Sequence, residues 1–193
     1  SGGHLYASTE SGSIFCFSHK DKPGAVYRRS TAKTPEIQDI SSNTHAPEIL
    51  SALADIRKGY CLVLPAGDGS FMAQIAGNTG LHVIGAVKTR EKADRLREKL
   101  LSAGLYGTRC TVVVAEDRTL PFTDYMMNAV VFDQNRTSDA AAWDTNDILR
   151  VVRPYGGIII PPSGSGNTFR TAASRDEWES TRSKRAGVFL TRK

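Results

Sequence analysis

A loop with two glycines is the segment whose composition points most directly to ligand chemistry. It reads Pro65-Ala66-Gly67-Asp68-Gly69-Ser70 and follows the apolar run Cys61-Leu62-Val63-Leu64. Glycine lets the backbone turn tightly and approach a ligand, and a helix that follows offers unpaired N–H groups at its start. The loop predicts a ligand contact over residues 66–69, although a plain strand-to-helix turn has the same composition.

Polar residues also follow three later apolar runs. Lys88 comes after residues 83–87, Glu116 and Asp117 after residues 111–115, and Asp133 after residues 129–132. In open α/β sheets, ligands bind beyond the carboxyl ends of the strands. The family resemblance given below implies that these four residues are candidate site residues, with Asp133 as a weak catalytic candidate. A solvated aspartate at a strand end has the same pattern.

Alternating strands and helices predict the fold that positions these residues. Strands are expected at residues 61–64, 82–87, 111–115, 129–132 and 157–160, and helices at 47–56, 70–76, 90–103 and 139–152. This alternation implies right-handed crossovers and parallel strands. We predict an α/β domain over residues 46–193, with a doubly wound, mostly parallel Rossmann-like sheet. The tail around Trp178 and residues 187–190 adds an antiparallel edge strand.

Four segments of that domain resemble class I S-adenosylmethionine-dependent methyltransferases in order and spacing. They are Val63-Leu64-Pro65-Ala66-Gly67-Asp68-Gly69, Val83-Ile84-Gly85-Ala86-Val87-Lys88, Glu116-Asp117-Arg118-Thr119-Leu120-Pro121-Phe122 and Ile148-Leu149-Arg150-Val151-Val152-Arg153-Pro154-Tyr155-Gly156-Gly157. The resemblance implies S-adenosylmethionine as a small-molecule cofactor and a methyl acceptor that the sequence does not name. By position, Gly67 and Gly69 pass close to the methionine part of the cofactor. Asp117 accepts a hydrogen bond from the adenine amino group.

Three positions depart from the pattern of that family. Pro65 stands where an acidic residue is usual, and Phe71 replaces a third glycine. Lys88 stands where an aspartate or glutamate usually accepts hydrogen bonds from both ribose hydroxyls, and lysine is only a donor. Losing such a charged acceptor costs roughly 1.5–3 kcal/mol per hydrogen bond, or at least about tenfold in affinity. The segment at residues 132–135 also lacks the Asn/Asp-Pro-Pro-aromatic motif of amino-methylating members.

The first eighteen residues form a separate pattern, a predicted β-hairpin with strands at residues 4–8 and 14–17. The segment from Gly3 to Phe17 resembles one repeat of a quinoprotein-type (PQQ-like) β-propeller. That resemblance implies a longer, propeller-containing parent protein, and such proteins are often exported or belong to the cell envelope. Residues 19–45 are polar and aperiodic, which predicts a linker.

Composition narrows the function classes. Hydrophobic residues make up 40% and charged residues 23%, which is a globular balance. No apolar run approaches the roughly 20 residues that span a bilayer. Three distant cysteines and four scattered histidines predict neither a disulfide framework nor a metal site. The net charge is +5, and the basic residues of the tail alternate with acids, which predicts a solvated face. No aromatic stacking platform accompanies these basic residues, so the tail does not favour a nucleic-acid partner.

Three hypotheses about function remain open from the sequence. The first is a methyltransferase-like domain attached to a propeller, with weak or degenerate cofactor binding. The second is a lapsed enzyme on the same fold that now has a structural or interaction role. The third, ranked well below these, is an NADP-dependent oxidoreductase in which Lys88 pairs with a 2′-phosphate. The loop lacks the third glycine of GxGxxG, which argues against this third hypothesis.

Overall fold

A computed structural model describes residues 4–8, 14–18, 46–115, 117, 119–134, 143–162, 165–173, 178–183 and 187–193. The chain divides into two compact units, Ser1–Ala32 and Lys33–Lys193, and each is described by itself. The predicted linker at residues 19–45 lies outside the described residues, as does the hairpin turn at residues 9–13.

The first unit contains the predicted hairpin. Strands β1 (His4–Ser8) and β2 (Ile14–Ser18) pair antiparallel, with Tyr6 opposite Cys16. The large apolar side chains of this hairpin are more than half exposed: Leu5, Tyr6, Ile14, Phe15 and Phe17. The described part of the hairpin therefore buries little apolar surface of its own.

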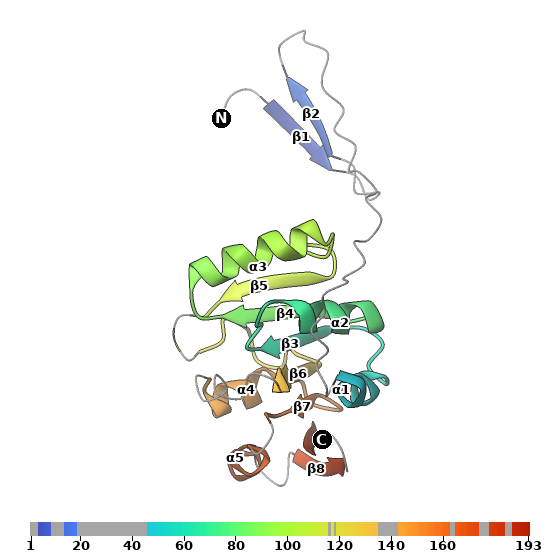
Figure 1. Cartoon of the computed structure of the whole chain (residues 1–193), viewed down its shortest axis with the longest axis vertical. Helices are drawn as coiled ribbons and strands as arrows, with labels where there is room; N and C mark the ends of the chain where they lie inside the picture. The colour runs from blue at the N-terminus through green and yellow to red at the C-terminus, as the bar shows by residue number, and fades with distance from the viewer. Residues whose placement is uncertain are drawn as a thin grey trace. The chain divides into compact units, whose positions relative to one another are not determined.

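The second unit is built on a seven-stranded sheet in the order β5-β4-β3-β6-β7-β9-β8. Its strands are β3 (Tyr60–Leu64), β4 (His82–Val87), β5 (Cys110–Val114), β6 (Ala129–Phe132), β7 (Ile158–Ile160), β8 (Trp178–Ser183) and β9 (Gly187–Arg192). The strands from β5 to β7 are parallel, and β9 runs antiparallel to both of its neighbours. Figure 1 shows this progression from β5, just below α3, to β8 near the bottom of the view. The sheet confirms the predicted doubly wound, mostly parallel α/β fold.

Helices cover both faces of the sheet. They are α1 (Ala46–Leu53), α2 (Ser70–Asn78), α3 (Arg90–Ser102), α4 (Thr145–Val151) and α5 (Gly166–Ala172). Side chains alternate along β3, so that Cys61 and Val63 pack with α1, α2 and α3, while Leu62 and Leu64 pack with α4 and α5. This double burial explains why the strands of the parallel part are continuous apolar runs.

The structure corrects three details of the sequence analysis. Within the described residues, the helix predicted over 139–152 begins at Thr145, because the Asp144 carboxylate accepts hydrogen bonds from the main-chain N–H groups that follow it. The second difference lies in the described residues after β7, which form the short helix α5 and two antiparallel strands instead of the single predicted edge strand.

The third correction concerns Arg192 in the basic tail. It is not a solvated charge, since its guanidinium donates to the carbonyls of Leu149 and Val152 at 3.2 and 2.9 Å. It also lies against the rings of Tyr125 and Trp178. Arg192 thereby fastens β9 to the end of α4.

Candidate functional site

A pocket of about 410 Å³ lies beyond the carboxyl ends of β3 and β4. Its walls come from the loop after β3 (Pro65, Gly67, Asp68), the end of β4 (Val87, Lys88), one side of α3 (Lys92, Arg95, Leu96, Lys99) and Trp143. The neighbours of β3 are β4 and β6, so the chain reverses its winding direction at this point of the sheet. Ligands of doubly wound folds bind at such a switch point.

The glycine loop packs tightly against α3. Gly67 and Gly69 have φ values of 59° and 86°, which side-chain-bearing residues rarely adopt. A Cβ atom at Gly69 would lie 2.5 Å from Leu96 Cδ1. The loop therefore needs glycine at residue 69 both for its backbone conformation and for its close approach to α3.

Asp68 is tied to both walls of the pocket. Its carboxylate accepts hydrogen bonds from the Ser70 main-chain N–H at 3.1 Å and the Ser70 hydroxyl at 2.7 Å. It also pairs with the Lys99 ammonium at 3.0 Å. Partial burial alone would raise the pKa of Asp68, but the hydrogen bonds from Ser70 and Lys99 outweigh it and lower the pKa to about 2. A fixed negative charge therefore occupies the start of α2.

Lys88 and Trp143 form the opposite wall. The Lys88 ammonium lies 3.9 Å from the centre of the Trp143 ring, within the range of a cation–π contact. It also donates a hydrogen bond to the main-chain carbonyl of Asp117 at 2.8 Å. Trp143 itself is only 3% exposed, so the pocket has one aromatic wall that is firmly packed.

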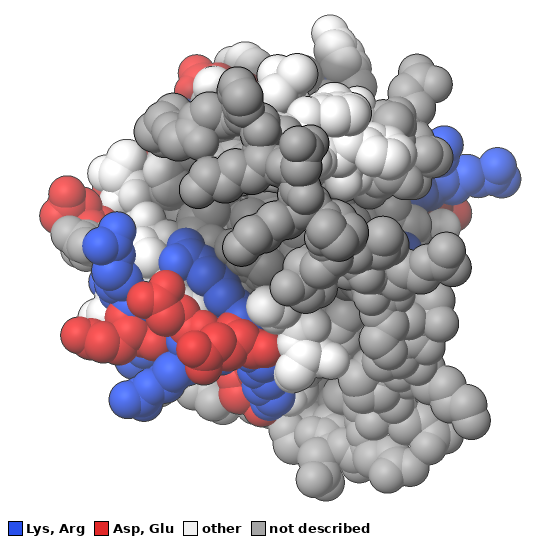
Figure 2. Space-filling view, turned by 90° about the horizontal axis from the view of Figure 1, so that it is seen from above, with Lys and Arg blue, Asp and Glu red and all other residues white. Residues whose placement is uncertain are grey.

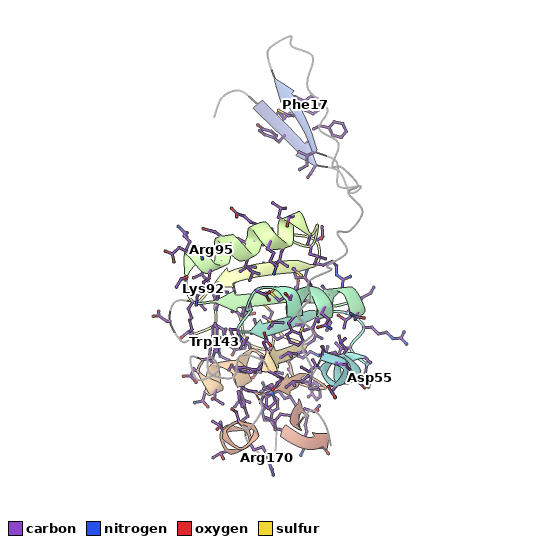
Figure 3. The ribbon with its side chains drawn as sticks, viewed as in Figure 1. Phe17, Asp55, Lys92, Arg95, Trp143 and Arg170 are labelled. Carbon is purple, nitrogen blue, oxygen red and sulfur yellow. The ribbon has the colours of Figure 1, made fainter. Side chains whose placement is uncertain are left out.

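The basic and acidic side chains of α3 differ in whether they line the pocket. Lys92, Arg95 and Lys99 line the pocket, whereas the acidic residues of the helix, Glu91, Asp94 and Glu98, do not. Figure 2 views the molecule from the α3 end and shows Lys/Arg and Asp/Glu side chains crowded together on part of that surface. In Figure 3, Lys92, Arg95 and Trp143 lie on the side of the sheet toward which the arrows of β3 and β4 point. Together with Lys88, α3 gives the pocket a predominantly cationic lining.

Asp117 borders a neighbouring hollow instead, which it shares with Thr119 and Leu120. The segment after it is anchored from α4. Arg150 donates to the Phe122 carbonyl at 2.8 Å and pairs with Asp124 at 2.7 Å, and Asp147 accepts a hydrogen bond from the Leu120 main-chain N–H. Asp117 is linked to the main pocket through its main-chain carbonyl, which accepts a hydrogen bond from Lys88.

The predicted site residues are thus brought together only in part. Gly67, Asp68 and Lys88 line the pocket, while Ala66 and Gly69 are buried behind it. Asp133 is 8% exposed at the end of β6, where its main-chain N–H donates to the Leu64 carbonyl at 3.0 Å. Glu116 lies outside the described residues.

Four charged or aromatic residues of the pocket are not among the predicted site residues: Lys92, Arg95, Lys99 and Trp143. The three cations recur at helical spacing after Lys88, a pattern that would have placed them on one side of α3. No local pattern indicates that Trp143 reaches the pocket, because its place depends on a contact with Lys88, which is far away in the sequence.

The next two findings concern metal-binding groups and membrane-spanning helices. Among the described residues, no group of three or more His, Cys, Asp or Glu side chains is placed to hold a metal ion. In that same part of the chain, no helix has the length and apolar character needed to cross a bilayer.

Comparison with solved structures gives the fold a precedent. A proposed S-adenosyl-L-methionine-dependent methyltransferase from Methanococcus maripaludis matches 78% of this chain and 84% of its own, with a TM-score of 0.56 and 14% identity. A SAM-dependent methyltransferase from Aquifex aeolicus matches 78% and 96%, with a TM-score of 0.54 and 12% identity. A geranyl diphosphate methyltransferase, solved with SAM, matches 61% of this chain at 16% identity and a TM-score of 0.50, and the match spans only 47% of that protein.

Sequence comparison adds no closer relative. No family model and no curated protein matches the chain. At the identities of the structural matches, the likeness concerns the fold. Residues 46–193 contain a Rossmann-like α/β sheet of the class I methyltransferase type.

Proposed function

We propose that residues 46–193 form a methyltransferase-like domain whose pocket holds the adenosyl group of S-adenosylmethionine. The observation that carries this proposal is the position of the pocket. It lies at the switch point of the sheet, between the Gly67–Gly69 loop and the end of β4, and it is large enough for a nucleoside. The structural neighbours named as SAM-dependent methyltransferases support the same choice of ligand.

The residues fit the adenosyl group better than they fit the whole cofactor. The glycine loop permits close backbone approach, and Trp143 offers an aromatic wall. The sulfonium cofactor carries a net positive charge, however, and the part of the pocket that the structure describes offers it four basic side chains and the carboxylate of Asp68. Lys88 supplies a donor where the two ribose hydroxyls need an acceptor. Weak cofactor binding is therefore part of the proposal.

Methyl transfer from a bound sulfonium needs positioning and desolvation rather than a fixed catalytic triad. Asp133 remains the candidate for orienting a methyl acceptor, because it lies at the end of β6, the strand next to β3. The chemical class of that acceptor is left open.

A lapsed enzyme on the same fold is the second candidate, and Lys88 is the observation that favours it. Its ammonium group donates a hydrogen bond to the Asp117 carbonyl and lies over the Trp143 ring. These two contacts stabilise lysine at this position. The NADP hypothesis is weakened by Asp68. A dinucleotide places its pyrophosphate at the start of the helix after the first strand, where this carboxylate is already bonded to Ser70.

Isothermal titration of the 193-residue chain with S-adenosylhomocysteine tests the proposal. We expect saturable binding at ligand concentrations up to the millimolar range. In NMR spectra of the same titration, we expect the amide chemical shifts of Gly67 and Lys88 to change. An absence of binding at that concentration contradicts cofactor use and leaves the lapsed module. NAD⁺, a dinucleotide without a phosphate on its ribose hydroxyls, is the matched comparison, and it is expected to bind more weakly than S-adenosylhomocysteine.

For the first unit, we propose that the hairpin is part of a propeller blade in a longer parent protein. Its exposed Tyr6, Phe15 and Phe17 are the kind of side chains that neighbouring strands cover. In the absence of neighbouring blade strands, we expect the amide hydrogens of the hairpin to exchange rapidly with solvent. Strong protection of Leu5 to Ala7 would contradict the proposal.

A further inference from the structure

The cationic side of the pocket is a feature that the proposed function leaves unexplained. Among the described residues, the cavity is lined by four basic side chains and one carboxylate: Lys88, Lys92, Arg95 and Lys99, with Asp68 as the acid. Only Lys99 is paired with that carboxylate. A positively charged wall of this density disfavours a cationic ligand and favours an anionic one.

The position of Asp68 determines where an anion can bind. Its carboxylate accepts two hydrogen bonds from Ser70 at the start of α2 and stays ionised, since its pKa is lowered to about 2. A phosphate next to the glycine loop would be repelled by this charge. Lys92 and Arg95 also line the cavity, one helical turn apart on α3, and neither is paired with Asp68.

Lys88 links this wall to the ribose end of a nucleoside. In doubly wound folds, the residue about twenty positions after the glycine loop, at the end of the second strand, contacts the ribose hydroxyls. An acidic residue there accepts from free hydroxyls, whereas a basic residue accommodates a phosphate on them. Lys88 occupies this position and is basic, and α3 adds Lys92 and Arg95 beside it.

We infer that the pocket selects an adenine nucleotide whose ribose carries a phosphate on its 2′- or 3′-hydroxyl, held by Lys88, Lys92 and Arg95. This inference rests on the proposed adenosyl pocket and names the charge class of its ligand. The adenosyl group lies between the glycine loop and Trp143, and the phosphate lies against α3. Charge-assisted hydrogen bonds from a lysine and an arginine are the strong type of contact for such a group.

Calorimetric titration of the full chain with four ligands tests this selection: adenosine, 2′-AMP, 3′-AMP and 5′-AMP. At pH 8 and low salt, where the phosphate is a dianion, we expect 2′-AMP or 3′-AMP to bind at least about tenfold more tightly than adenosine and 5′-AMP. Raising the salt to about 0.3 M should reduce this preference severalfold, because the contacts are partly exposed.

A double variant and a matched control locate the effect. Lys92→Gln with Arg95→Gln should reduce the preference for 2′-AMP or 3′-AMP over adenosine to below about threefold. Arg90→Gln removes a cation from the same helix that does not line this pocket, and it should keep the preference. Lys99 is left in place because it pairs with Asp68. Thermal unfolding confirms that each variant is folded.

The outcomes separate this inference from the proposed function. If S-adenosylhomocysteine and adenosine bind but the phosphate gives no preference, the inference is overturned and the adenosyl pocket stands. If the preference is present and S-adenosylhomocysteine does not bind, the inference is supported and cofactor use is contradicted. A preference that survives the double variant, or equal binding of 5′-AMP, overturns the inference.

Discussion

The ammonium group of Lys88 lies 3.9 Å from the centre of the Trp143 ring, and this contact joins the end of β4 to the segment before α4. The same ammonium group donates a hydrogen bond to the main-chain carbonyl of Asp117, in the loop that follows the neighbouring strand β5. Lys88 is therefore held by contacts to two other segments of the chain. In the adenosyl site that we propose, it reverses the charge expected next to the ribose hydroxyls.

Restoring the acidic residue tests the importance of that reversal. We predict that Lys88→Asp raises the affinity for S-adenosylhomocysteine by about tenfold, because a carboxylate accepts hydrogen bonds from the ribose hydroxyls. Calorimetric titration measures the change. The control is Lys58→Asp, which makes the same charge change at an exposed residue outside the pocket and should leave the affinity unchanged. Equal or weaker binding by Lys88→Asp would show that the shape of the pocket, rather than residue 88, limits the affinity for S-adenosylhomocysteine.

Two glycines of α2 and its loop should respond to alanine in opposite directions. Gly69→Ala is expected to lower the free energy of unfolding by about 1–3 kcal/mol, because φ is 86° there and the new Cβ meets Leu96. Gly77→Ala lies in the helix with no atom within 4 Å of the new Cβ, and it should raise stability by about 0.5–1 kcal/mol. Urea unfolding of both variants measures the difference. A stable Gly69→Ala variant would contradict the described loop geometry.

The fold follows from the sequence because its signals are local and repeated. Each parallel strand from β3 to β7 is an apolar run, and each is covered by helices whose apolar residues recur at helical spacing. The end of α3 was placed to within one residue for the same reason. The start of α4 was placed too early, because the residue that caps it, Asp144, lies inside a stretch whose composition also suits a helix.

The candidate site could be predicted only where it is made by consecutive residues. The glycine loop and Lys88 lie directly after strands, so their order in the chain indicates their position. Trp143 reaches the pocket through a tertiary contact, and no pattern within the chain reports it. Asp117 shows the converse, since its segment was recognised but its side chain lines the adjacent hollow.

The three cysteines should differ sharply in reactivity. Cys61 and Cys110 are fully buried, and burial raises the pKa of their thiols to about 12 and about 11. Cys16 is exposed. We predict that Ellman's reagent modifies one thiol in native buffer at pH 8 and three in guanidinium, because the thiolate is the reactive form. Cys16→Ser should abolish the native signal, and rapid labelling of that variant would contradict the burial of the other two.

Acid should weaken the domain through Asp68. Its pKa is lowered from 3.8 to about 2 in the folded state, so its carboxylate stabilises the fold fully above about pH 4 and loses that contribution as the pH falls toward 2. Because 53% of the side chain is exposed, screening limits the effect to below about 1 kcal/mol. Asp68→Asn removes the titrating group, so the stability difference between the two proteins should shrink between pH 4 and pH 2. Urea unfolding across this range measures it, and a difference that stays constant would show that the contacts of Asp68 with Ser70 and Lys99 do not depend on its charge.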